Sequence, residues 1–133
     1  MKYDKTIFFL LNRAYRPLER KINHLFKGCE IEAGSFFMLC AIDITTDSTM
    51  RVLAEHLGID PSGLSHVVLR LVEKGLILKK VGHDKRKVIV ALTVKGKAIV
   101  DKYMPLVDNL NKEILKADLY LMQTFNLLSS KYR

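Results

Sequence analysis

The chain has 133 residues, enough for one domain whose hydrophobic core needs no disulfide or metal to stabilise it. Hydrophobic residues make up 49% and charged residues 27%, which excludes a disordered chain and a membrane protein. The 22 Lys and Arg against 14 Asp and Glu give a net charge of +8, which favours a polyanionic partner.

No targeting or membrane-spanning segment is expected in this sequence. The apolar run 7–11 is too short for a signal-peptide core, and the longest run, 36–42, is far shorter than the about 20 residues that span a bilayer. Two cysteines, Cys29 and Cys40, cannot supply the disulfide framework of a small secreted domain. The sequence therefore predicts a cytoplasmic protein that does not contact a membrane.

Two helices are predicted in the first third of the chain, over residues 5–26 and about 33–43. Apolar residues recur at helical spacing in the first, at Ile7, Leu11, Ala14, Leu18, Ile22 and Leu25. Pro17 should kink this helix, and Gly28 should end it. The second is apolar almost all round and should be central to the core, with Phe36, Phe37, Met38, Leu39 and Ile42.

Two shorter helices should follow, joined by a tight turn that contains a glycine. Ser48 or Thr49 can cap the first of them, which runs to Leu57. Asp60, with its side chain accepting backbone N–H groups, should begin the second, over residues 61–74. The expected buried positions are Leu53, Ala54 and Leu57 in the first and Leu64, Val67, Val68 and Leu71 in the second. Two short helices around such a turn indicate a helix-turn-helix.

A β-hairpin is predicted directly after the helix-turn-helix, in the position of a wing. Residues 76–81 and 87–92 are rich in Leu, Ile and Val, and they flank turn-forming residues at 82–86. The positive charge is concentrated here, because residues 79–97 hold seven basic side chains and one acidic one, Asp84. A local cluster of one sign is typical of an element that contacts phosphates, although a solvated charged face has the same composition.

The last third should form two more helices. Thr93 can cap a long helix over residues 94–116, which Pro105 should bend. Asp118 can cap a final helix over residues 119–130. The long helix and the first helix of the chain carry more apolar surface than one small winged domain can cover. They should therefore pack against a partner, most simply a second copy of the chain.

Three segments resemble the MarR family of winged helix-turn-helix transcriptional regulators, and together the match spans essentially the whole chain. Residues 84–96, DKRKVIVALTVKG, are similar to the family's wing signature of Asp, any residue, Arg and a strand ending in Leu-Thr-x-x-Gly. Residues 53–59, LAEHLGI, resemble the first helix of its helix-turn-helix. Residues 62–77, SGLSHVVLRLVEKGLI, resemble its recognition helix.

The resemblance implies both a fold and a function. The fold is mainly α (α+β): a single MarR-like domain over 1–133, with a winged helix-turn-helix at about 33–93, a two-stranded wing, and dimerisation helices at about 5–27 and 94–131. The function is that of a homodimeric transcriptional regulator, a repressor, on a pseudo-palindromic operator in double-stranded DNA. The resemblance also implies that a small aromatic or lipophilic effector releases the protein from DNA. It implies no catalytic, cofactor or metal site.

Candidate DNA-binding residues lie on the polar side of the recognition helix: Ser62, Gly63, Ser65, His66 and Arg70. The N-terminal side chains of such a helix reach base edges in the major groove. Arg70 lies nearly two turns further on, so it should contact a phosphate or a distal base. An ordinary solvated helix face is the alternative. At the start of the preceding helix, Thr49 and Arg51 could contact phosphates or could equally be solvated.

The wing supplies the other candidates. Arg86 at its tip can enter the minor groove, where narrow A·T tracts concentrate negative potential. Lys85 and Lys87 would lie against phosphates, and Lys80 belongs to the same basic cluster. Asp84, as the resemblance implies, should pair with a basic side chain and hold the shape of the wing. A flexible charged hairpin without a DNA contact is the alternative.

Other functions find less support in the sequence. An enzyme is not expected, because the chain has no phosphate-cradling glycine loop, no nucleophile elbow and no metal-ligand cluster. Two non-enzymatic alternatives stay open: a winged-helix module that binds protein, and a protein that coats DNA without sequence preference. A protein-binding wing would not need its excess of positive charge, and a coating protein would not prefer a palindrome.

Two further features invite a regulatory interpretation. Some relatives sense peroxides through a cysteine in the first helix, but here no cysteine precedes Cys29, whose acidic neighbours disfavour a thiolate. Cys40 lies in the most apolar segment and should be inert packing. An effector cavity could involve Phe36, Phe37, Tyr103 and Met104, although apolar stripes of this kind are more often core.

Overall fold

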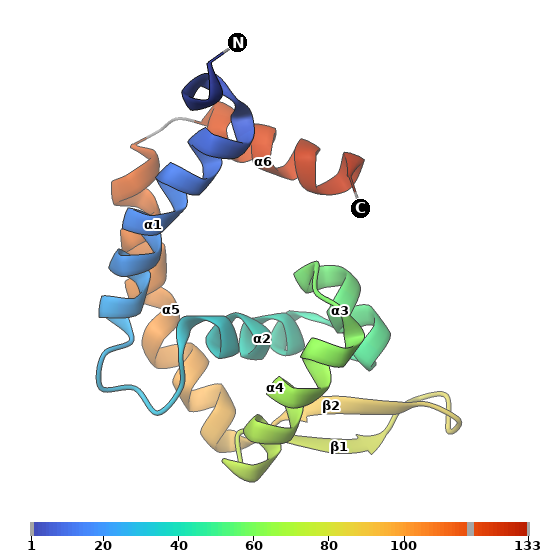
Figure 1. Cartoon of the computed structure of the whole chain (residues 1–133). Coiled ribbons are helices and arrows are strands. Elements are labelled where there is room, and N and C mark those ends of the chain that lie inside the picture. Colours follow the sequence, from blue (N-terminus) through green and yellow to red (C-terminus); the bar gives the residue numbers. More distant parts are fainter. Residues whose placement is uncertain (1, 117–118, 133) are drawn as a thin grey trace. The chain divides into compact units, whose positions relative to one another are not determined.

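The computed structural model describes residues 2–116 and 119–132, which form two compact units divided between Ala33 and Gly34. The elements in chain order are η1 (Tyr3–Lys5), α1 (Ile7–Leu25), α2 (Ala33–Ile44), α3 (Met50–Leu57), α4 (Pro61–Glu73), β1 (Ile77–Val81), β2 (Val88–Leu92), α5 (Val94–Leu115) and α6 (Leu119–Lys131) (Figure 1). The predicted fold class is confirmed: a mainly helical chain with a helix-turn-helix and a two-stranded wing.

The N-terminal unit is built around α1, which is two residues shorter at its start than predicted. Thr6 caps the helix, because its Oγ1 accepts a hydrogen bond from the Phe9 N–H at 3.4 Å. The helix ends at Leu25 rather than continuing toward Gly28, because the Phe26 N–H bonds back to the Asn23 carbonyl and the Lys27 N–H to the His24 carbonyl, each at 3.2 Å. No residue of α1 is buried. The predicted apolar stripe is therefore present but uncovered.

The core of the second unit is formed by α2 together with the helices and strands that follow it. Its buried side chains include Phe36, Met38, Leu39 and Ile42 of α2, Leu53 of α3, Leu64, Val68 and Leu71 of α4, and Ile77, Ile89 and Val90 of the wing. The prediction that Phe37 is part of this core is wrong, because its side chain is 42% exposed. A helix in a small domain keeps one side open to solvent even when nearly all its residues are apolar.

The helix-turn-helix has the predicted boundaries except that α4 ends one residue early, at Glu73, and the structure decides between the two possible caps of α3. Thr49 is the cap, with its Oγ1 accepting from the Val52 N–H at 3.2 Å, while Ser48 is buried and donates to the Thr45 carbonyl. α3 ends at Gly58, which has a φ of 65° and so suits a left-handed cap. Leu57 is only half-buried, contrary to its predicted burial.

α4 begins at Pro61 as predicted, but the predicted cap by Asp60 is wrong. The Asp60 side chain makes no capping hydrogen bond, and only its backbone carbonyl accepts, from the Leu64 N–H at 3.0 Å. Proline at the first helical position removes one donor and fixes φ, so the helix starts without a side-chain cap. Val67 is half-buried rather than buried, since it lies at the edge of the apolar stripe.

The wing is an antiparallel hairpin with the register Ile77↔Leu92 to Val81↔Val88. Each strand is one residue shorter at its start than predicted. The Gly82 N–H donates to the Lys87 carbonyl at 2.9 Å and closes the turn. The Val90 N–H donates to the Ser48 carbonyl at 2.9 Å, so the segment before α3 is fixed to β2. This bond anchors the wing to the helix-turn-helix.

The start of α5 is locked onto the end of α4. The Thr93 hydroxyl donates to the Gly75 carbonyl at 2.7 Å and accepts from the Gly96 N–H at 3.1 Å, which confirms the predicted cap. A side chain at Gly96 would collide with the carbonyl oxygen of Leu76. Helix α5 continues through Pro105, as α1 does through Pro17. The predicted cap at Asp118 lies outside the described residues.

Candidate nucleic-acid interface

The polar face of α4 carries all five candidate residues in exposed positions. Ser62, Gly63, Ser65, His66 and Arg70 are exposed, while Leu64, Val68 and Leu71 on the same helix are buried. The spacing of the buried residues therefore turns the polar ones outward. The Ser65 hydroxyl donates to the Pro61 carbonyl at 3.0 Å, so its proton is used within the helix and its oxygen can still accept a hydrogen bond.

The wing tip is organised by Asp84, and its basic partner is Arg86. The carboxylate accepts from the Arg86 backbone N–H at 3.0 Å, from Nε at 3.2 Å and from Nη2 at 3.3 Å. The hydrogen bonds from the Arg86 side chain lower the pKa of Asp84, so it is ionised at neutral pH. A guanidinium has five N–H donors, and the two used here leave three for another acceptor.

The other wing candidates, Lys80, Lys85 and Lys87, are exposed in the hairpin. Besides the bond from the Val90 N–H to the Ser48 carbonyl, this hairpin is held to the rest of the unit by packing of α4 on β1 and of α5 on β2, and His83 Nε2 lies 3.9 Å from Asp47 Oδ1 before α3. The recognition helix and the wing are therefore neighbouring parts of one compact unit (Figure 1). Their exposed polar and basic side chains are free to face a common ligand.

An open hollow of about 430 Å³ lies between the start of α3 and the start of β2. Its lining residues are Thr49, Met50, Arg51, Val52, Glu55, Lys87 and Val88. Both Lys87 and Arg51 line this hollow. Lys87 was predicted to contact DNA from the wing, whereas the sequence left open whether Arg51 contacts a phosphate or is merely solvated. The signal in the sequence was weak because the two residues are 36 positions apart, and only the fold of the unit brings the start of α3 and the start of β2 to one hollow.

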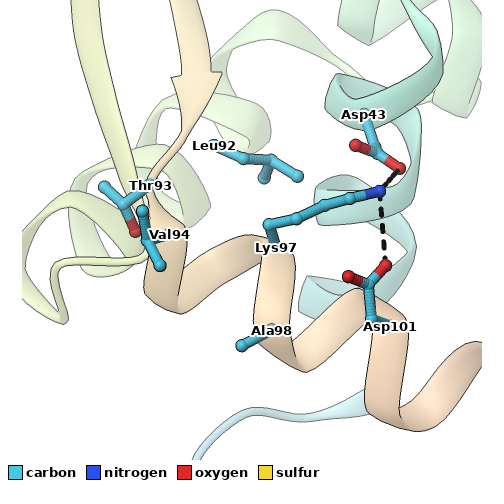
Figure 2. A pocket seen from close by; sticks show the side chains of 7 residues that line it. All are labelled: Asp43, Leu92, Thr93, Val94, Lys97, Ala98 and Asp101. Carbon is cyan, nitrogen blue, oxygen red and sulfur yellow. Dashed lines mark hydrogen bonds and ion pairs between the residues drawn. The ribbon is translucent and has the colours of Figure 1, made fainter.

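A second hollow, of about 520 Å³, lies where α2, β2 and the start of α5 meet (Figure 2). Lys97 projects from α5 and joins Asp43 Oδ2 at 2.8 Å and Asp101 Oδ1 at 3.3 Å. These two hydrogen bonds raise the pKa of Lys97, so its charge is secure at neutral pH. The ion pair between Lys97 and Asp43 fixes the start of α5 to the end of α2. Sequence reasoning had counted Lys97 only as part of the basic cluster.

Of the residues proposed for an effector cavity, the three aromatic ones pack against one another through Phe36, while Met104 is 43% exposed. Phe36 is fully buried, and the centroid of its ring lies 5.7 Å from that of Phe37 and 6.4 Å from that of Tyr103, in edge-on arrangements.

Cys40, also on α2, is half-buried. Burial raises the pKa of its thiol to about 11, and the negative charge of Asp43 adds to the shift. A thiol with so high a pKa is a weak nucleophile. This supports the interpretation of Cys40 as packing.

Two negative findings hold for the part of the chain that the structure describes. Within residues 2–116 and 119–132 there is no group of three or more His, Cys, Asp or Glu side chains that could hold a metal ion. None of the helices in these ranges is both long enough and apolar enough to cross a bilayer.

The arrangement of a helix-turn-helix, an exposed recognition helix and a basic wing defines a winged-helix protein. No protein-family model matches the chain. It is 31% identical over 109 residues to the multiple antibiotic resistance protein MarR of Escherichia coli K12, covering 80% of this chain and 76% of that protein. This protein therefore belongs to the MarR family of transcriptional regulators, which are not enzymes.

Solved structures have the same fold. The S. aureus MepR–DNA complex matches with a TM-score of 0.85 at 16% identity, covering 97% of this chain and 99% of that one. CouR of Rhodococcus jostii RHA1, bound to p-coumaroyl-CoA, matches with a TM-score of 0.84 at 23% identity, covering 98% and 94%. The predicted resemblance to the family and the predicted winged helix-turn-helix fold are both confirmed.

Proposed function

We propose that this protein acts in the cytoplasm as a homodimeric repressor that binds a pseudo-palindromic operator in double-stranded DNA. The observation that carries the proposal is the exposed polar face of α4 beside a wing whose charge is almost entirely positive. Helices of this kind read base edges in the major groove, and basic hairpins contact the adjacent backbone and minor groove. Membership of a family of transcriptional regulators supports the same role.

The proposed contacts divide by chemistry. Ser62, Ser65 and His66 read bases, and Gly63 lets the start of α4 approach a phosphate. Arg70 contacts a phosphate or a distal base. In the wing, Arg86 enters the minor groove while Lys80, Lys85 and Lys87 neutralise phosphates, and Asp84 holds Arg86 in place. The exposure of all the proposed DNA contacts and the hydrogen bonds between the half-buried Asp84 and Arg86 support this division.

A homodimer is supported by apolar surface on the terminal helices. α1 buries none of its residues, and Phe8 is 83% exposed. On α6, Tyr120 and Leu127 are 80% and 63% exposed. Exposed apolar area of this extent is typical of subunit interfaces. Two-fold symmetry would then place two recognition helices about one DNA turn apart, which is why the operator should be pseudo-palindromic.

Release by a small aromatic or lipophilic effector completes the proposal. It is supported by the structural likeness to CouR, which was solved with p-coumaroyl-CoA bound. The aromatic contacts around Phe36 would have to open for such a ligand, because this side chain is fully buried. Loss of DNA affinity on addition of the effector would support this part, and unchanged affinity across a library of aromatic acids would contradict it.

The test of the main proposal is selection of bound sequences from random duplexes, followed by anisotropy titrations with the selected duplex and a scrambled one. A repressor predicts a selected site with two inverted half-sites about 10 bp apart and at least about 1,000-fold weaker binding to the scrambled duplex. Equal affinity for both duplexes would favour a DNA-coating protein. No binding to either would favour a winged-helix module that recognises an acidic protein.

Base reading by α4 is tested separately with His66→Ala and Ser65→Ala. Each variant should change which bases are preferred in the half-site, because the exposed N-terminal turns of this helix face the groove in the proposed complex. The measurement is affinity across a panel of single-base operator variants. A uniform loss at every position would instead assign these side chains to the phosphate backbone.

A further inference from the structure

The hollow between α3 and β2 brings two basic side chains and one carboxylate to the same place. Arg51 and Glu55 come from α3, and Lys87 comes from the tip end of the wing, directly before β2. The Arg51 side chain is 87% exposed and that of Glu55 is 60% exposed. Glu55 lies one helical turn after Arg51, and its Oε1 is 3.3 Å from the Arg51 Nε. The only basic group of the trio with an assigned role so far is Lys87.

A guanidinium binds carboxylates and phosphates through the same N–H donors. While Glu55 accepts from Arg51 Nε, that donor cannot be given to a phosphate without breaking the existing bond. Glu55 also lines the hollow itself, so its negative charge repels any phosphate that enters. Arg51 from α3 and Lys87 from the wing both attract a phosphate in the hollow, and Glu55 opposes them.

We propose that this hollow binds one backbone phosphate of duplex DNA between Arg51 and Lys87, and that Glu55 weakens DNA binding by competing with the phosphate for Arg51. The inference rests on the proposed function and adds two residues to it: Arg51 as a phosphate contact and Glu55 as a residue that limits affinity. A regulator that must release its operator benefits from such a limit.

Duplex DNA fits this hollow better than a small free anion does. The hollow is open and is bounded by the two structures that the proposed function already places on DNA, the helix-turn-helix and the wing. The backbone carbonyl of Ser48, just before α3, is bonded to β2 at Val90, so the two walls are held together. A phosphate bound there would share the strand that the wing contacts through Lys87.

The experiment compares four full-length variants on the selected operator duplex: Arg51→Gln, Glu55→Gln, the double variant, and Glu113→Gln as a control. The control makes the same change of charge at an exposed position of α5 outside the hollow. Affinity is measured by anisotropy at several salt concentrations, and melting temperature is measured for each variant. All the changed side chains are exposed, so the melting temperatures should stay close to that of the unchanged protein.

Arg51→Gln should weaken binding about tenfold and lower the salt slope by about one unit, equally for all sequences. Glu55→Gln should strengthen binding about two- to fivefold, which is what an exposed ion pair contributes. In the double variant most of this gain should vanish, since Arg51 is no longer present to be released, and only the smaller part that comes from direct repulsion should remain. Glu113→Gln should leave affinity within a factor of about 1.5.

Three results would overturn the inference while leaving the proposed function intact. Arg51→Gln binding as tightly as the unchanged protein would mean that the hollow holds no phosphate. No gain in Glu55→Gln, or a full gain that persists in the double variant, would show that Glu55 does not act through Arg51. If the unchanged protein binds no duplex at all, the proposed function fails first and the inference fails with it.

Discussion

At the scale of single residues, Arg86 is both the partner of Asp84 and the proposed minor-groove contact. The two roles are compatible, because Asp84 uses Nε and one proton of Nη2 and leaves the rest of the guanidinium available. The carboxylate restricts the side chain to fewer conformations before DNA arrives. This lowers the entropy that must be lost on binding.

Replacement of Arg86 tests the wing directly. Arg86→Ala should weaken operator binding about 10- to 100-fold, with most of the loss at A·T-rich flanks, because a groove contact carries sequence information. Lys87→Ala should instead weaken all sequences about equally and lower the salt slope by about one unit. Affinity across operator variants and across salt concentrations distinguishes them. Unchanged affinity in Arg86→Ala, with the melting temperature preserved, would mean that the wing does not contact DNA.

Cys40 gives a second prediction at this scale. Burial raises its pKa from 9.0 to about 11, so the fraction of thiolate at pH 7.5 is about 100-fold lower than in an exposed thiol. In a Cys29→Ser variant, alkylation of Cys40 by iodoacetamide should be at least about 100-fold slower in the folded protein than in urea. Mass spectrometry measures both alkylation rates. Equal rates in the folded protein and in urea would show that the Cys40 thiol is reactive and would again favour a redox role.

At the scale of elements, the junction between α4 and α5 explains why a glycine stands at position 96. Thr93 uses one hydroxyl to cap α5 and to bond the Gly75 carbonyl, and this draws the first turn of α5 against Leu76. There is no room for a Cβ at Gly96, because the Leu76 carbonyl oxygen occupies its place. The atoms that the Cβ would meet belong to the backbone of Leu76, so the clash can be relieved only by moving the segment that leads into the wing.

Two glycine-to-alanine variants test this junction against a matched control. Gly96→Ala should lower the free energy of unfolding by about 1–3 kcal/mol, the usual effect of overpacking. Gly63→Ala on α4, where nothing lies within 4 Å of the added Cβ, should raise it by about 0.5–1 kcal/mol through helix propensity. Urea unfolding measures both. A Gly96→Ala variant as stable as the unchanged protein would contradict the close approach.

The Gly63→Ala variant also separates two interpretations that the sequence left open. If Gly63 allows a phosphate to approach α4, the variant should be more stable but bind DNA more weakly. If glycine is merely tolerated at this position, DNA affinity should be unchanged.

At the scale of the whole molecule, the chain leaves apolar residues uncovered in both of its compact units. In the N-terminal unit these include Phe8, and in the second unit they include Tyr120 and Leu127 of α6. Burying a large apolar side chain contributes about 1.5–3 kcal/mol, so a few such residues are enough to hold two chains together. In the proposed homodimer, the partner subunit would bury these apolar side chains.

Sedimentation tests the dimer. The protein should sediment as a single dimeric species at micromolar concentration, and Phe8→Asp should raise the dissociation constant at least about tenfold, because it places a charge in the proposed interface. Val81→Asp is the matched control, since Val81 is 62% exposed on β1 of the wing, outside the proposed dimerisation helices, and should leave the dimer intact. A folded, stable monomer of the unchanged chain would contradict the proposal.

The sequence by itself determined the order and type of the elements. The local signals are the apolar spacing, Pro61 and Thr93 as helix starts, and the turn residues of the wing. They are local because helices and hairpins form through neighbours a few positions apart. The excess of positive charge at 79–97 indicated a polyanionic ligand for the same reason: it can be counted along the chain. These signals were sufficient for the winged helix-turn-helix, and the family followed from the resemblance of residues 53–59, 62–77 and 84–96 to known regulators.

Only the tertiary structure decided which residues from distant segments meet. It left Phe37 exposed and the Asp60 side chain without a capping bond, although the local pattern favoured the opposite. It paired Lys97 with Asp43 in an ion pair, and it brought Arg51, Glu55 and Lys87 to one hollow. Such contacts depend on how α2, α3, β2 and α5 pack, and packing is set by the fit of whole surfaces rather than by spacing along one element.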